Sequence, residues 1–178
     1  MGKLLLGLLF GLIDFNITVG NCVLGLLPDF IGYNVIRKGA EELEDKSEYF
    51  KMIQPIAKVM FIVTAVRYAL DALGLYAILG FVGTLIDFAI MIVMFVVTYR
   101  IVQGVEEIEK NYKISLVGDI MRQAWWIRTA CTVFAYVALF IPMLLSVAVI
   151  ASIVSGVWFL IVFLQSKRLY VEKFGEEA

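Results

Sequence analysis

Four long apolar segments constrain the fold more than any other feature of the sequence. They run over residues 56–73, 75–99, 125–141 and 143–165. An α-helix rises ~1.5 Å per residue and the hydrocarbon core of a bilayer is ~30 Å thick, so each segment is long enough to cross. Because 62% of the residues are hydrophobic and only 17% are charged, we expect an all-α, polytopic transmembrane helical bundle.

The Lys and Arg residues predict how these helices cross. Thirteen of the fifteen fall into three clusters, over residues 37–58, 100–128 and 167–173. The short connections at 72–74 and 141–143 lack Lys and Arg. By the positive-inside rule the charged loops and the C-terminus face the cytoplasm, and the short connections face outward. The four segments therefore form two helical hairpins.

Two internal similarities favour an arrangement of tandem hairpins. The hairpins at 56–110 and 122–174 align with an offset of 68 residues, and Gly39–Glu44 resembles Gly104–Glu109. On this interpretation residues 1–44 are a first, degenerate hairpin, and the single membrane domain 1–178 contains three repeats, as many transport folds do. Chance similarity between apolar helices is the alternative.

The first unit has a length problem. The segment from Lys3 to Asp14 gives only about 18 Å of helix, whereas Ile17 to Arg37 gives about 32 Å. Either a short first arm turns near Asp14 to Asn16, or a longer one turns at Gly20 and Asn21. In both cases non-helical backbone lies within apolar sequence, which is tolerated only when buried in protein or facing water. We therefore expect a broken or re-entrant hairpin, giving five to six membrane segments.

The N-terminal quarter resembles a known pattern. Its parts are Asp14-Phe15-Asn16-Ile17, Leu27-Pro28-Asp29-Phe30-Ile31-Gly32-Tyr33 and Lys38-Gly39. They are similar to the start of small, uncharacterised multi-pass membrane proteins of Gram-positive bacteria. The resemblance implies a bacterial plasma membrane and implies no activity.

Five ionisable residues remain inside the apolar sequence, namely Asp14, Asp29, Asp71, Asp87 and Arg67. Such residues are costly in a membrane and by default indicate a functional site or a pairing. Arg67 and Asp71 are i and i+4 on one helix, so we expect a local ion pair. Asp87 lies midway between Leu75 and Tyr99, and Arg67 lies ~9 Å nearer the outer end. We therefore expect Asp87 to be neutral, or to hold a cation or a water chain.

Asp29 has two interpretations. It follows Pro28, so it can stabilise the first turn of a helix. Alternatively, it lines a polar site inside the membrane. The residues of that candidate site are Asp14, Asn16, Asn21, Asp29 and Asp87.

Small residues at a spacing of four mark candidate surfaces for close helix packing. They are Gly7 and Gly11 in the first unit, and Ala148, Ser152 and Gly156 in the last.

Several function classes find no support in the sequence. Histidine is absent, and Cys22 and Cys131 show no metal or redox spacing, so we expect no cofactor and no metal site. No catalytic motif is present, and an enzyme is the least favoured class. Nothing indicates nucleic-acid binding.

Two functions are left, both with the lipid bilayer as surroundings. The first is a small transporter or channel-like protein for a cation, a proton or a small solute, which uses the intramembrane Asp residues. The alternative is an accessory or assembly subunit that binds a membrane-protein partner, or a second copy of itself, through small-residue helix faces or acidic loops.

Overall fold

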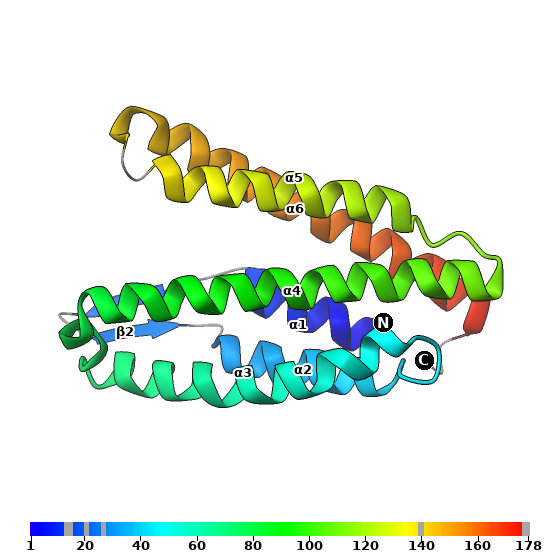
Figure 1. Ribbon diagram of the computed structural model, residues 1–178, viewed down its shortest axis with the longest axis horizontal. Helices are drawn as coiled ribbons and strands as arrows, with labels where there is room; N and C mark the ends of the chain where they lie inside the picture. Colours follow the sequence, from blue (N-terminus) through cyan, green and yellow to red (C-terminus); the bar gives the residue numbers. More distant parts are fainter. Residues whose placement is uncertain (13–15, 20–21, 26–27, 139–140, 176–178) are drawn as a thin grey trace. The chain divides into compact units, whose positions relative to one another are not determined.

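The computed structural model describes residues 1–12, 16–19, 22–25, 28–138 and 141–175 (Figure 1). The predicted helical fold is confirmed. One short two-stranded ribbon is added to it. The elements are α1 (Gly2–Leu12), β1 (Asn16–Val19), β2 (Cys22–Gly25), α2 (Asp29–Glu41), α3 (Glu48–Ala72), η1 (Tyr76–Leu79), α4 (Phe81–Tyr112), α5 (Gly118–Ala138) and α6 (Pro142–Phe174).

Three of the described helices are long and apolar enough to cross a membrane, namely Glu48–Ala72, Phe81–Tyr112 and Met143–Phe174. They correspond to α3, α4 and nearly all of α6. Helix α5 has 21 residues, but Arg122, Gln123 and Arg128 lower its mean hydropathy, because charged and amide side chains are poorly accommodated in hydrocarbon. The membrane crossing of α5 stays a prediction.

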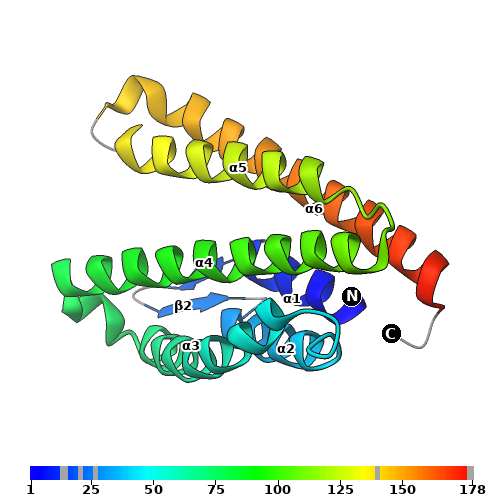
Figure 2. The ribbon, with the colours of Figure 1, turned by 45° about the vertical axis from the view of Figure 1, so that its right-hand side comes forward.

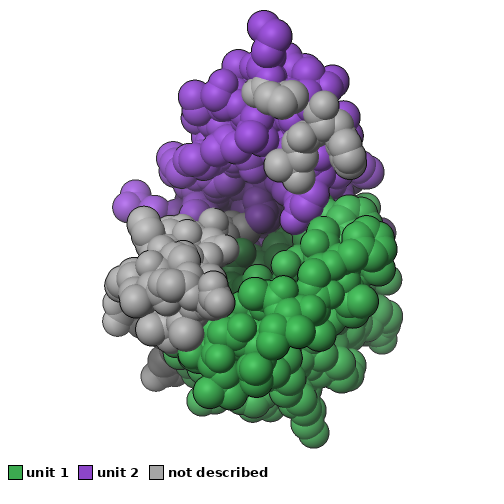
Figure 3. Space-filling view, turned by 90° about the vertical axis from the view of Figure 1, so that its left-hand side faces the viewer, with its two compact units in different colours: residues 1–101 green, residues 102–178 purple. Residues whose placement is uncertain are grey.

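The chain forms two compact units, residues 1–101 and residues 102–178 (Figure 3). Each unit has buried apolar side chains of its own. Helix α4 contributes its first part to the first unit and its last part to the second.

Helices α1 and α2 of the first unit pack closely because glycine faces the partner backbone. A Cβ on Gly32 would lie 2.8 Å from Cβ of Phe10, and one on Gly39 would lie 2.8 Å from the backbone nitrogen of Leu4. Both distances are shorter than real Cβ contacts allow. Leu4 and Ile36 are buried in this unit.

The hairpin predicted over residues 1–44 is broken, and segment lengths alone did not show where the break lies. Helix α1 has 11 residues and α2 has 13, or about 16 and 20 Å, so neither crosses a bilayer by itself. Between them β1 and β2 pair antiparallel, with Val19 opposite Cys22. The ribbon lies beside α3, toward the end that carries η1 (Figure 1, Figure 2). The sequence suggested a helical arm over 17–37, whereas the structure has two strands in the first part of this range. Pairing between the strands satisfies part of the hydrogen bonding that the backbone of this segment requires.

A second departure lies between α3 and α4. The sequence suggested one membrane helix over 75–99, but η1 intervenes and α4 begins at Phe81. Gly74 and Gly80 adopt positive φ values of 69° and 50°, a conformation that glycine adopts without steric cost. These glycines allow the sharp connection, and they move the start of α4 six residues along the chain.

The second unit is an antiparallel hairpin of α5 and α6, preceded by the end of α4. Phe159, Phe163 and Tyr170 are fully buried in it. The turn from α4 into α5 is held by Glu109, whose carboxylate accepts hydrogen bonds from the backbone N–H groups of Leu116 and Gly118. This carboxylate satisfies N–H groups that a helix start leaves without intrahelical partners.

Candidate functional site

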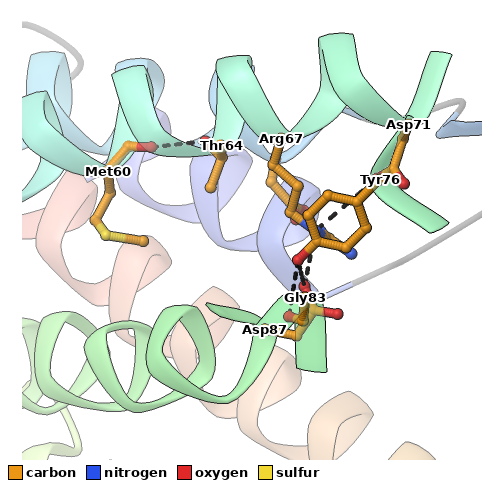
Figure 4. A network of polar contacts seen from close by, with 8 residues as sticks. Met60, Thr64, Arg67, Asp71, Tyr76, Gly83 and Asp87 are labelled. Carbon is orange, nitrogen blue, oxygen red and sulfur yellow. Dashed lines mark hydrogen bonds and ion pairs between the residues drawn. The ribbon is translucent and has the colours of Figure 1, made fainter. Parts of the chain in front are cut away.

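One arginine gathers three carboxylates from three helices of the first unit. Nε of Arg67 lies 2.8 Å from Oδ1 of Asp87 and 3.9 Å from Oδ2 of Asp71, and its Nη1 lies 3.7 Å from Oδ2 of Asp29. The contact with Asp87 is an ion pair by distance, while the direction of the Nε–H does not meet hydrogen-bond geometry. We call these four residues the Arg67 cluster; Figure 4 labels Arg67, Asp71 and Asp87.

Local sequence explains the position of each member. Arg67 and Asp71 are one turn apart on α3, so their side chains share a face. Asp29 is the first residue of α2, and the N-cap before it is Pro28 in an extended conformation. Its carboxylate therefore lies where the positive end of the helix dipole favours negative charge. Asp87 is in the second turn of α4.

Tyr76 ties the connecting turn to the cluster. Its hydroxyl lies 2.8 Å from Oδ1 of Asp87 and 2.9 Å from the carbonyl oxygen of Gly83. The guanidinium carbon of Arg67 lies 5.3 Å from the centre of the Tyr76 ring, within the range of a cation–π contact. A Cβ on Gly83 would lie 3.3 Å from the Tyr76 ring, so the missing side chain leaves room for the tyrosine against α4.

The electrostatics of Tyr76 favour its role as a donor. Tyr76 lies in η1, outside the spans of α3 and α4. Burial and the hydrogen bond to Asp87 raise the pKa of its hydroxyl. The hydroxyl therefore keeps its proton, which Asp87 or the Gly83 carbonyl can accept.

The structure corrects the expected depth of Asp87. Counted from residue 75 it would lie at the centre of its helix, out of easy reach of Arg67. Because α4 begins at Phe81, Asp87 lies only about 9 Å from the helix start. Arg67 lies five residues before the end of α3, or about 8 Å. The two residues are therefore at similar depth, and Arg67 is the partner that we did not expect for Asp87.

The structure does not describe the side chains of the other residues of the predicted polar site. Asp14 and Asn21 are not among the described residues, and the backbone of Asn16 lies in β1. Of the predicted set, Asp29 and Asp87 are brought together through Arg67. Sequence reasoning assigned Arg67 and Asp71 to a separate local pair and overlooked Tyr76. Tyr76 lies eleven residues before Asp87, and no signal in the sequence indicated this contact, because residue 76 falls inside the apolar segment expected over 75–99.

The small residues predicted at helix contacts have different surroundings. A Cβ on Gly7 would lie 2.6 Å from Ile36, which indicates close packing of α1 on α2. One on Gly11 would meet the flexible end of Met94. In α6, Ala148 is buried and Ser152 lies 3.4 Å from Thr132 of α5, oxygen to oxygen.

Gly156 departs from the expected packing. A Cβ there would meet no atom within 4 Å. Gly156 therefore makes no close helix contact among the described residues.

Two further observations bound the chemistry of the site. Among the described residues, no group of three or more acidic or cysteine side chains is arranged to hold a metal ion. No protein-family model, curated protein or solved structure matches the chain. The functional interpretation therefore depends on the Arg67 cluster.

Proposed function

We propose that the protein is a small transporter or channel-like protein of the bacterial plasma membrane, which moves a proton or a small cation past the Arg67 cluster. On this proposal the charged loops and the C-terminus face the cytoplasm, and the cluster lies toward the outer side. The observation that carries the proposal is the grouping of Asp29, Asp71 and Asp87 around one guanidinium.

The charge balance of the cluster favours a positive ligand. Three ionised carboxylates and one guanidinium sum to −3 + 1 = −2. Two unit charges 4 Å apart interact by about 4 kcal/mol at an effective dielectric constant near 20. A single Arg67 cannot offset three carboxylates, because each carboxylate also repels the other two. Uptake of a proton relieves that repulsion, and a small cation passing the cluster does so without the three-ligand coordination that the described residues do not offer.

Tyr76 links proton uptake to hydrogen bonding. Its one hydroxyl proton faces two acceptors, at 2.8 Å in Asp87 and 2.9 Å in Gly83. When Asp87 is ionised, the Tyr76 hydroxyl can donate a well-aligned hydrogen bond to only one of these two acceptors at a time. When Asp87 is protonated, its own O–H can donate to the Tyr76 oxygen while Tyr76 donates to the Gly83 carbonyl. In that arrangement Asp87 and Tyr76 each donate one hydrogen bond.

The broken N-terminal unit supports the same proposal. In transport folds, interrupted membrane segments place helix ends and irregular backbone beside the ion path. Here the N-terminus of α2 presents Asp29 to Arg67, and the ribbon lies beside α3, which carries Arg67. Such backbone is tolerated at membrane depth where it is buried in protein or lines water.

The test is ion flux in proteoliposomes that contain a pH-sensitive dye for protons or a dye selective for Na⁺ or K⁺. Imposed gradients of protons, Na⁺ and K⁺ would be compared for the wild type, Asp87→Asn and the control Asp119→Asn. Asp119 is an exposed carboxylate at the start of α5, paired with Arg122. We expect Asp87→Asn to lower the flux at least about tenfold, as a loss of more than 1.4 kcal/mol in barrier stabilisation would. The control should keep the wild-type rate.

Two outcomes would contradict the proposal. One is the absence of flux above that of empty liposomes under every gradient. The other is a flux that Asp87→Asn leaves unchanged. Co-purification of a stoichiometric membrane-protein partner together with either outcome would support the accessory-subunit hypothesis instead.

A further inference from the structure

A half-buried arginine in the other unit, Arg128, has no carboxylate beside it among the described residues. Arg128 is at the middle of α5, ten residues from each end. Its guanidinium carbon lies 5.7 Å from the centre of the Phe159 ring of α6. Among the described residues no carboxylate lies within ion-pair distance of Arg128, and its Nη1 is buried without a hydrogen-bond partner. The neighbouring Thr129 Oγ1 is also buried and unpartnered.

Arg128 differs in this lack of a carboxylate partner from Arg67, which pairs with Asp87. An arginine stays charged in proteins, and buried charges are normally paired with an opposite charge. A ring face attracts the guanidinium but supplies no counter-charge and no hydrogen-bond acceptor. Arg122, six residues earlier on the same helix, shows the usual solution, because it pairs with Glu106 at 3.4 Å and Asp119 at 2.9 Å. Among the described residues, the surroundings of Arg128 therefore lack an anion.

The position of Arg128 indicates which anion can reach it. It follows Trp125 and Trp126 by about one helical turn, and the Trp126 side chain is exposed. Tryptophan pairs at the start of an apolar segment are typical of the membrane interface. Long arginine side chains just inside that interface extend toward the headgroups while their stems stay in the apolar layer. Farther along the hairpin, past Phe159 in the direction of the C-terminus, α6 carries the basic residues Lys167 and Arg168.

We propose that Arg128 binds the phosphate group of an anionic phospholipid beside the α5–α6 hairpin, at the membrane interface that Trp125 and Trp126 mark. The planar guanidinium can donate two parallel hydrogen bonds to phosphate oxygens. Basic side chains between membrane helices near an anionic leaflet are a recognised setting for lipid headgroups. Inorganic phosphate offers the same chemistry from water, so the test separates the two sources. This site is in the second unit and does not depend on the transport proposal.

The experiment is lipid titration followed by native mass spectrometry of the full chain in detergent micelles. The probes are phosphatidylglycerol, phosphatidylcholine and inorganic phosphate. The variants are Arg128→Gln, Arg128→Lys and the matched control Arg122→Gln. For the wild type we expect the first phosphatidylglycerol to bind about tenfold more tightly than phosphatidylcholine. Arg128→Gln should abolish that preference, and Arg122→Gln should preserve it within about twofold.

Arg128→Lys protects the test against a variant that fails to fold. Lysine keeps the charge but loses the bidentate geometry, so it should fold with a wild-type helical spectrum and bind phosphatidylglycerol more weakly than the wild type. Displacement of the lipid by millimolar inorganic phosphate would support phosphate binding and identify the free anion as a ligand. Equal binding of phosphatidylglycerol by the wild type and Arg128→Gln, or equal binding of both lipids by the wild type, would overturn the proposal.

Discussion

Replacing Arg67 with glutamine removes the one cation of the Arg67 cluster. At the measured separations of 2.8, 3.7 and 3.9 Å, each direct attraction is roughly 4–6 kcal/mol at an effective dielectric constant near 20. The sum of these attractions overestimates the loss of stability in Arg67→Gln, because the charged groups are better solvated when they are separated. Removing one partner of a buried pair costs about 3–5 kcal/mol, whereas exposed pairs contribute about 0–1 kcal/mol. The four side chains are 18% to 39% exposed, so we expect a loss of about 2–3 kcal/mol.

The assay is unfolding by SDS in mixed micelles near neutral pH, followed by helical circular dichroism. The matched control is Arg37→Gln, which breaks an i, i+4 pair with Glu41 at the surface of α2 and should cost less than about 1 kcal/mol. A double variant, Arg67→Gln with Asp87→Asn, returns the cluster to −2 and should recover part of the loss. The reasoning is refuted if Arg67→Gln costs no more than Arg37→Gln, or if the double variant is less stable than Arg67→Gln.

Three further predictions use the same unfolding assay. Tyr76→Phe removes the donor shared by Asp87 and Gly83 and should cost about 1–2 kcal/mol; wild-type stability would show that this hydrogen bond is not formed. Gly39→Ala places a methyl group against the backbone of α1 and should lower the stability by about 1–3 kcal/mol. Gly156→Ala places its methyl group in open space and should raise the stability by up to about 1 kcal/mol through helix propensity. Equal effects of the two substitutions would contradict the packing described. Glu109→Ala leaves the N–H groups before α5 without their carboxylate and should cost about 1–2 kcal/mol, and a neutral result would argue against that cap.

Much of the fold could be predicted because membrane helices follow from length and apolarity. The segment over 143–165 lies within α6, and all of the segment over 56–73 except its last residue lies within α3. The boundary before α4 could not be predicted in this way, since residues 75–80 are as apolar as a helix interior. Only the local backbone, with Gly74 and Gly80 at positive φ, shows that the helix starts later. Apolar composition likewise could not distinguish a ribbon from a helix over 16–25.

The candidate site shows the same limit at the level of single residues. Sequence spacing identified the Arg67 and Asp71 pair, because i, i+4 geometry is local. It also singled out Asp29 and Asp87 as costly charges in apolar sequence. What joins them is the reach of Arg67 from α3 to the start of α2 and to the second turn of α4, which depends on the late start of α4. Tyr76 was overlooked because a tyrosine near a membrane boundary is ordinarily read as an interfacial residue.

The most direct test of the central claim is infrared difference spectroscopy of the purified protein, recorded between low and neutral pH and with or without added Na⁺ or K⁺. If the Arg67 cluster binds a proton or a cation, the carboxyl and carboxylate bands should change with ligand in the wild type. The Na⁺- or K⁺-dependent change should be smaller in Asp87→Asn and unaltered in Asp119→Asn, whereas in the pH difference each variant loses the band of its own carboxyl group. A spectrum in which Asp87→Asn leaves every ligand-dependent carboxyl band unchanged would contradict the assignment of this cluster as the site.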